Sequence, residues 1–309
     1  MKSSAPTPTD VVPSQDGNRV TTVVTRTLTH VIASQGKLGV TAVTSLGDDV
    51  FVMRGSSEQV EVYDARTFTL QRHIAVPLRR SWSRSHIAVT GLRQRSFGLA
   101  ACAHHKRLYV SDSVNDRIHR AKLSGSGTVK KWSVAGWPRG LSVNKAYNVV
   151  VACREADKIQ EYTTRGVLVR EISLRQAGVT SPWHAVQLSS GHYAVSQYAS
   201  QSQSLVSVVG VDGQVVVRSR PSPASDVRQM RHPCTLAVTK NDDILLADIF
   251  NNRILSVNSS LSSERQLTLP ADGGIQEPCG LCLDESRGRL YVGENGGSYR
   301  LLVFDGVTL

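Results

Sequence analysis

Four prolines recur at nearly constant spacing through the second half of the chain. Pro138 and Pro182 are 44 residues apart, Pro182 and Pro233 are 51 apart, and Pro233 and Pro278 are 45 apart. Each of these prolines stands at or just before a short apolar run. A repeat of about 40 to 50 residues made of such runs is typical of a β-propeller blade. The spacing therefore constrains the chain to a ring of repeated β-sheets.

Each repeat reads as an apolar strand, a turn marked by Gly or Asp, a second apolar strand, a polar loop and a third strand. No convincing helical periodicity separates these runs, so their apolar faces must be buried by stacking sheets on neighbouring sheets. A ring of radial blades provides that burial. The first strands are expected at 40–43, 97–101, 140–143, 184–188, 235–238 and 280–283, and the second strands at 48–53, 107–112, 148–153, 192–197, 243–248 and 289–294.

The sequence therefore predicts an all-β protein, a six-bladed β-propeller that occupies residues 18–309. Residues 1–17 are rich in Ser, Thr, Pro and Asp, and we expect them to form a flexible segment. The sixth blade lacks an outer strand of its own, so residues 19–32 should supply it and close the ring, which removes an exposed sheet edge. The blades are expected at about 37–90, 91–136, 137–180, 181–230, 231–276 and 277–309.

The net charge indicates the kind of partner, and the cysteine content indicates the redox state of the thiols. Lys and Arg total 36 against 25 Asp and Glu, a formal net charge of +11, which favours an anionic partner such as RNA or an acidic protein surface. Five cysteines, an odd number, lie mostly in apolar runs and are expected to be reduced core thiols. The sequence shows neither a run of about 18 apolar residues nor a signal peptide, which predicts a cytoplasmic, monomeric protein without membrane contact.

Two segments carry a family resemblance. Residues 109–118 (YVSDSVNDRI) and 245–254 (LLADIFNNRI) resemble the Asp, Asn, Arg, Ile pattern of the NHL repeat, with weaker copies at 54–60 and 153–159. The pattern over residues 19–309 resembles the C-terminal domain of TRIM-NHL proteins, a propeller that recognises RNA or proteins. The same spacing places Asp112 five residues before Arg117, and Asp248 five before Arg253. We expect both pairs to form ion pairs that brace their turns.

One face of the propeller is the expected binding surface. The loops that lead into the first strands and the loops that join second to third strands converge on that face. Their arginines could neutralise phosphates while their aromatic rings stack on unpaired bases, so the sequence predicts binding of single-stranded or stem-loop RNA. The predicted contacts are Arg54, Arg95, Phe97, Trp137, Arg139, Arg154, Trp183, His184, Tyr198, Arg231, His232 and Phe250.

Alternatives remain open for part of this set and for the function. Trp137 and Trp183 could instead pack over the ends of adjacent blades, and Arg154 could pair with Glu155 or Asp157. The second candidate function is a protein-interaction platform, such as the substrate-recruiting domain of a TRIM-type ubiquitin ligase. Its partner would be an acidic peptide or domain.

Catalysis and cofactors are not expected. A metal-dependent propeller enzyme needs several His or carboxylate groups that converge from different blades. Among the starts of the first strands only His184 and His232 qualify. Cys279 and Cys282 have a CxxC spacing, but in a strand their side chains point to opposite faces. The sequence therefore predicts a recognition module that is not an enzyme and holds no metal or cofactor.

Overall fold

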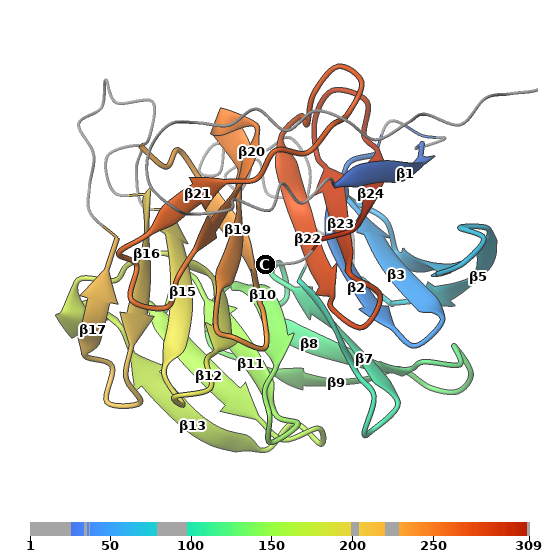
Figure 1. Cartoon of the computed structure of the whole chain (residues 1–309). Coiled ribbons are helices and arrows are strands. Elements are labelled where there is room, and N and C mark those ends of the chain that lie inside the picture. The colour runs from blue at the N-terminus through green and yellow to red at the C-terminus, as the bar shows by residue number, and fades with distance from the viewer. Residues whose placement is uncertain are drawn as a thin grey trace, which may run out of the picture.

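The computed structural model is an all-β ring of six four-stranded antiparallel sheets arranged around a central axis (Figure 1). It describes residues 26–33, 36, 38–78, 98–198, 204–219 and 229–307. The prediction of a six-bladed β-propeller is confirmed. Four of the six innermost strands begin at the prolines that set the repeat. Proline suits the first position of a strand because it has no N–H to donate to the ladder.

The strands follow one another outward in each of the first five blades. Blades 1 to 3 contain β2 (Val40–Leu46), β3 (Asp49–Arg54), β4 (Gln59–Asp64), β5 (Leu70–Ala75), β6 (Leu99–Cys102), β7 (Arg107–Asp112), β8 (Arg117–Lys122), β9 (Lys130–Ser133), β10 (Pro138–Val143), β11 (Val149–Cys153), β12 (Lys158–Tyr162) and β13 (Leu168–Ser173). Blades 4 to 6 contain β14 (Pro182–Gln187), β15 (Tyr193–Tyr198), β16 (Ser204–Val209), β17 (Val215–Arg218), β18 (Pro233–Val238), β19 (Ile244–Asp248), β20 (Arg253–Val257), β21 (Glu264–Gln266), β22 (Pro278–Asp284), β23 (Arg289–Glu294) and β24 (Leu301–Asp305).

The sixth blade is closed by a strand from the other end of the sequence. Strand β1 (Thr27–Ile32) pairs antiparallel with β24 and completes the order β22, β23, β24, β1. Figure 1 shows the blue β1 beside the red β24. The predicted ring closure is confirmed for the described part of the segment. Residues 19–25 and the segment 1–17 lie outside the described residues.

The core consists of apolar clusters between neighbouring blades. Phe51 and Met53 of blade 1, for example, pack in one cluster with Leu108 and Val110 of blade 2, and the exposed fraction of each is 1% or less. Burying one such side chain fully contributes about 1.5–3 kcal/mol. The five cysteines are free and four of them are buried, in agreement with the prediction. The blades are thus held together by sheet-on-sheet burial.

Glycine allows the inner strands of neighbouring blades to approach closely. A Cβ atom at Gly98 would lie 2.2 Å from the carbonyl oxygen of Arg139. A Cβ atom at Gly140 would lie 2.0 Å from Cδ2 of His184. Both distances are far below van der Waals contact, so these positions accept no side chain. The two glycines therefore allow the backbone of Arg139 and the ring of His184 to lie directly against the inner strand of the neighbouring blade.

The predicted acid–arginine pairs have different outcomes in blades 2 and 5. Asp248 Oδ2 lies 2.9 Å from Arg253 Nε, so this ion pair is confirmed. Asp112 Oδ2 instead lies 3.2 Å from His119 Nε2. The predicted Asp112–Arg117 ion pair is therefore wrong, although the two residues are backbone partners between β7 and β8.

Candidate functional site

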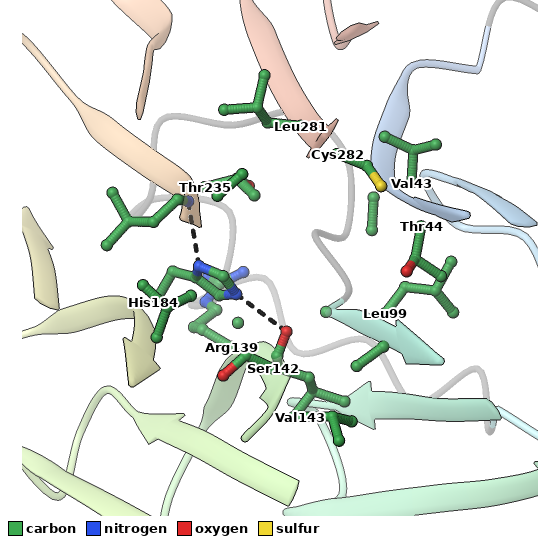
Figure 2. A pocket seen from close by; sticks show the side chains of 18 of the residues that line it. Val43, Thr44, Leu99, Arg139, Ser142, Val143, His184, Thr235, Leu281 and Cys282 are labelled. Carbon is green, nitrogen blue, oxygen red and sulfur yellow. Dashed lines mark hydrogen bonds between the residues drawn. The ribbon is translucent and has the colours of Figure 1, made fainter. Parts of the chain in front are cut away.

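The central channel holds a cavity of about 240 Å³ lined by residues of the inner strands. Figure 2 shows mostly small or apolar side chains around it, among them Val43, Leu99 and Val143. Arg139 and His184 also line this cavity. They come from the ends of β10 and β14 at which those strands begin. We call the side of the ring on which β10, β14, β18 and β22 begin the proline face.

His184 joins three blades. Its Nε2 lies 2.9 Å from the carbonyl oxygen of Leu141, and its Nδ1 accepts a hydrogen bond of 3.1 Å from the backbone N–H of Leu236. Nε2 therefore carries the proton of a neutral ring (dashed lines in Figure 2). Burial lowers the pKa of His184 to about 4. Both ring nitrogens are engaged within the protein, so this predicted RNA contact has no nitrogen left for a ligand.

The buried His184 predicts a loss of stability in acid. Its pKa is near 6.5 in the unfolded chain and about 4 in the folded protein. Between these values the unfolded state binds the extra proton, so stability is present above about pH 6.5 and falls as pH falls toward about 4. The loss approaches about 1.4 kcal/mol per pH unit. Urea unfolding of His184→Gln from pH 7 to 4.5 should show a shallower pH dependence than the parent chain.

An exposed histidine provides the matched control for this measurement. His73 lies in β5 with its side chain exposed, so His73→Gln makes the same substitution outside the core and is unfolded in urea under the same conditions. Equal slopes for His184→Gln and the parent would show that His184 does not contribute to acid destabilisation.

Two buried arginines meet at the proline face. The guanidinium carbon of Arg139 lies 5.0 Å from the ring centre of Trp137 and 4.5 Å from that of Trp183. The guanidinium carbon of Arg154 lies 5.2 Å and 5.6 Å from the same two rings. The arginines are 5% and 7% exposed. A cation–π contact contributes about 2 kcal/mol when it is desolvated, so the tryptophans stabilise both charges.

The two guanidinium groups raise each other's electrostatic free energy. Burial, followed by the charge of Arg154, lowers the pKa of Arg139 to about 9. Burial also lowers the pKa of Arg154. Both remain cationic at neutral pH. The positive charge is therefore concentrated in a site that water hardly reaches.

The carboxylates considered for Arg154 do not bind it. Asp157 pairs with Arg175 instead, at 3.2 Å. Glu155 acts on Arg154 through longer-range attraction. Nη1 of Arg154 has no hydrogen-bond partner among the described residues. The predicted pairing of Arg154 with Glu155 or Asp157 is therefore wrong, and this guanidinium can still donate to a ligand.

His232 extends the site toward the aromatic rings of blades 4 and 5. It is fully buried, with its ring centre 3.9 Å from that of the stacked Tyr198 ring and 4.6 Å from that of Trp183, whose ring is nearly perpendicular to it. Phe250 lies 5.1 Å away. Burial, together with Arg154 and Arg139, lowers the pKa of His232 to about 3, so its ring is neutral. Neither ring nitrogen has a hydrogen-bond partner among the described residues.

The Asp of the fifth repeat positions His232. Asp248 Oδ1 accepts hydrogen bonds from the backbone N–H groups of Arg231, at 2.8 Å, and His232, at 3.2 Å. Its Oδ2 accepts from Asn251 Nδ2 at 2.7 Å and from Arg253 Nε at 2.9 Å. Asn251 ends the short 3₁₀ helix η3 (Ile249–Asn251), which carries Phe250. The motif that suggested the resemblance thus fixes two site residues, a role that sequence analysis did not assign.

Trp137 is held in a strained backbone conformation. Its φ is 60°, which is rare for a residue other than glycine and is disfavoured before a proline. Such a conformation costs about 1–3 kcal/mol. The N–H of Trp137 donates to Asp116 Oδ1 at 2.6 Å, and its carbonyl accepts from the N–H of Arg154 at 3.1 Å. Both tryptophans are buried, so the packing alternative describes their position.

Seven predicted residues converge on the proline face, and we call them the arginine–tryptophan cluster. They are Trp137, Arg139, Arg154, Trp183, Tyr198, His232 and Phe250.

The other predicted residues lie outside this cluster. Arg54 is engaged by Glu61, with Nε 3.0 and 2.9 Å from the two carboxylate oxygens. Arg231 is exposed. Arg95 and Phe97 lie outside the described residues. Within the described ranges, no three His, Cys, Asp or Glu side chains group as metal ligands. That part of the chain also holds no helix of the length and apolar character needed to cross a membrane.

Comparisons with known proteins show the fold. No protein-family model and no curated protein sequence matches the chain. A catalytically inactive virginiamycin B lyase from Staphylococcus aureus with quinupristin has a TM-score of 0.60 at 12% identity, covering 88% of this chain and 82% of that one. Kuenenia stuttgartiensis hydrazine synthase has a TM-score of 0.56 at 17% identity, with 89% and 77% covered.

A nidogen/laminin complex is also similar in structure. It has a TM-score of 0.57 at 16% identity, covering 78% of this chain and 83% of that chain. The same propeller fold thus occurs in the nidogen/laminin complex and in a virginiamycin B lyase. The NHL-type assignment stays a prediction. At these identities, the comparisons establish that the chain has the fold of a six-bladed β-propeller.

Proposed function

We propose that the chain is a recognition module that binds single-stranded or looped RNA on its proline face. The convergence of two buried guanidinium groups with four aromatic rings in the arginine–tryptophan cluster carries this proposal. Guanidinium groups bind phosphate through charge-assisted hydrogen bonds, and aromatic rings stack on unpaired bases. The formal net charge of +11 favours the approach of a polyanion.

Recognition without catalysis fits the chemistry of the cluster. A general base works best when its pKa lies near the working pH. His232, the imidazole of the cluster with unengaged nitrogens, has a pKa lowered to about 3 by burial and by the two arginines. It is therefore a weak base at neutral pH, and we propose that it acts as a neutral hydrogen-bonding group.

Selection of bound RNAs from a random pool tests the proposed function. The parent chain should enrich a motif, and Arg139→Gln/Arg154→Gln should bind the enriched RNA at least about 100-fold more weakly. Each charge-assisted hydrogen bond contributes about 1.5–3 kcal/mol, and about 1.4 kcal/mol is a tenfold change in affinity. Thermal melting should confirm that the variant folds.

A second double variant separates the site from the overall charge. Arg66 and Arg165 are exposed, so Arg66→Gln/Arg165→Gln removes the same charge from elsewhere on the surface. This control should keep most of the affinity. A variant with the cluster removed should also show a smaller dependence of affinity on salt than the control. Equal losses in the two double variants, or no enrichment from the pool, would contradict RNA recognition at this cluster.

A protein-interaction platform is the second candidate, and one observation favours it. The outer part of blade 3 exposes Val167, Leu168 and Val169, at 62%, 47% and 47%, and the neighbouring β17 exposes Val216 at 57%. Clustered apolar side chains on a surface often mark protein contacts. Failure of the RNA selection would favour this platform, of which the substrate-recruiting domain of a TRIM-type ligase is one form.

A further inference from the structure

We infer that the arginine–tryptophan cluster takes the terminal phosphate of an RNA strand and not an internal phosphodiester. This inference rests on the proposed function and names the chemical group recognised. It is carried by the burial of Arg139 and Arg154, by the unengaged donors beside them, and by the half-buried rings at the edge of the cluster.

The charge of the site fits a phosphate monoester. Arg139 and Arg154 are 5% and 7% exposed. Both guanidinium groups contact the rings of Trp137 and Trp183, so their two positive charges lie close enough to interact. An internal phosphodiester carries one negative charge. A phosphate monoester carries about 1.5 to 2 at neutral pH. A terminal phosphate therefore brings more of the negative charge that two buried guanidinium groups attract than an internal phosphodiester does.

The hydrogen-bond donors also fit a chain end. Nη1 of Arg154 and the imidazole of His232 have no hydrogen-bond partner among the described residues. A phosphate monoester presents three oxygens that are not esterified, and these can accept from several donors at once. An internal phosphodiester presents two, and its nucleotides continue on both sides. Guanidinium groups as buried as these are reached more easily by a chain end than by the middle of a strand.

The rings at the edge of the cluster can hold the terminal base. Tyr198 and Phe250 are half-buried, and their ring centres are 6.3 Å apart. Both flank His232, at 3.9 and 5.1 Å. A nucleotide whose phosphate contacts Arg154 and His232 would place its base near these rings. Stacking on aromatic rings is a common way for a protein to hold an unpaired base.

The test compares RNAs that differ only at their ends. A pool of random RNAs about ten nucleotides long is prepared with a 5′-monophosphate, a 3′-monophosphate, hydroxyl groups at both ends, or as closed circles. Fluorescence anisotropy should give about 10-fold or greater tighter binding for one of the two phosphorylated pools than for the hydroxyl and circular pools. The preferred phosphorylated pool identifies which end of the strand is bound.

Two variants assign the preference to the cluster. Arg154→Gln and His232→Asn should reduce the preference for the phosphorylated end toward the level of the hydroxyl pool, whereas Arg66→Gln/Arg165→Gln should retain it. Thermal melting verifies folding of each variant. Binding of all four pools with equal affinity would overturn the terminal-phosphate inference and leave RNA recognition standing. Binding of none would overturn both, and an end preference that survives in Arg154→Gln and His232→Asn would place the phosphate elsewhere.

Discussion

Asp248→Ala is expected to lower the free energy of unfolding by about 3–5 kcal/mol, the usual effect of removing one partner of a buried ion pair. Asp248 is fully buried and accepts four hydrogen bonds. Its removal takes away the Asp248 carboxylate to which the guanidinium of Arg253, itself 9% exposed, donates. It also frees the backbone N–H groups that precede β18. A typical domain has only about 5–15 kcal/mol of stability, so this variant should be marginally folded.

Equilibrium unfolding in urea measures this loss, with an exposed aspartate as control. Asp212 is exposed and accepts one hydrogen bond from the backbone N–H of Gln214, at 3.0 Å. Asp212→Ala should therefore change stability by less than about 1 kcal/mol. If the two variants lose similar amounts, the buried ion pair of blade 5 does not stabilise the propeller as the structure indicates.

Removal of residues 1–32 is expected to produce both instability and self-association. Strand β1 covers β24, whose residues Leu301, Leu302, Val303 and Phe304 are fully buried. Leu28 of β1 also packs against the core between blades 5 and 6. Without β1, the backbone N–H and C=O groups on the outer edge of β24 lose their partners. An unpaired edge beside apolar side chains is a template for pairing with other chains.

Size-exclusion chromatography with light scattering, at several protein concentrations, tests this expectation. The truncated chain should form larger species as concentration rises and should melt at a lower temperature than the parent. Val31→Lys is a suitable control because that side chain is 47% exposed and the strand remains. A truncated chain that matches this control in size and melting temperature would show that β1 is dispensable for closing the ring.

The fold could be predicted because its signal is local and repeated. The apolar runs recur in each blade and the prolines in four of the six, and the first and second strands lie close to where these patterns predict. Ring closure could be predicted because the sixth repeat lacks an outer strand, which the N-terminal segment can supply. The segment 77–95 in the first repeat does not follow the pattern and lies mostly outside the described residues.

The site could be predicted only in part, because side-chain partners across the sheets are not evident from the sequence. Arg54 is neutralised because Glu61 of β4 lies opposite Val52. In blade 3 the corresponding partner of Val151 is Gln160, an amide, so the proline end of that blade lacks this carboxylate. Arg54 pairs with the first residue of β2, whereas Cys153 pairs with the first residue of β10, so Arg154 stands one residue beyond the position of Arg54. The sequence alone does not show this shift, which separates a bracing arginine from one available to a ligand.

Two further differences depend on contacts between strands or blades. His119 stands seven residues after Asp112, where blade 5 has Leu255 after Asp248, so an imidazole reaches the acid in one blade and not in the other. Both ring nitrogens of His184 form hydrogen bonds with backbone groups of blades 3 and 5. The sequence contains the residues for both contacts but not the distances between them.

The closing strand also sets the order in which the protein can be completed during synthesis. Thr29 donates a hydrogen bond to the carbonyl oxygen of Val303, although the two are 274 residues apart in sequence. A ribosome adds about 5–20 residues per second, so translating the residues between Thr29 and Val303 takes roughly 14–55 s, and β1 has no partner strand during that time. Throughout that interval its polar residues, including Thr27, Thr29 and His30, face water without a sheet to join. Blades 1 to 5 can assemble as they emerge, and the sixth becomes complete only when translation has passed Asp305.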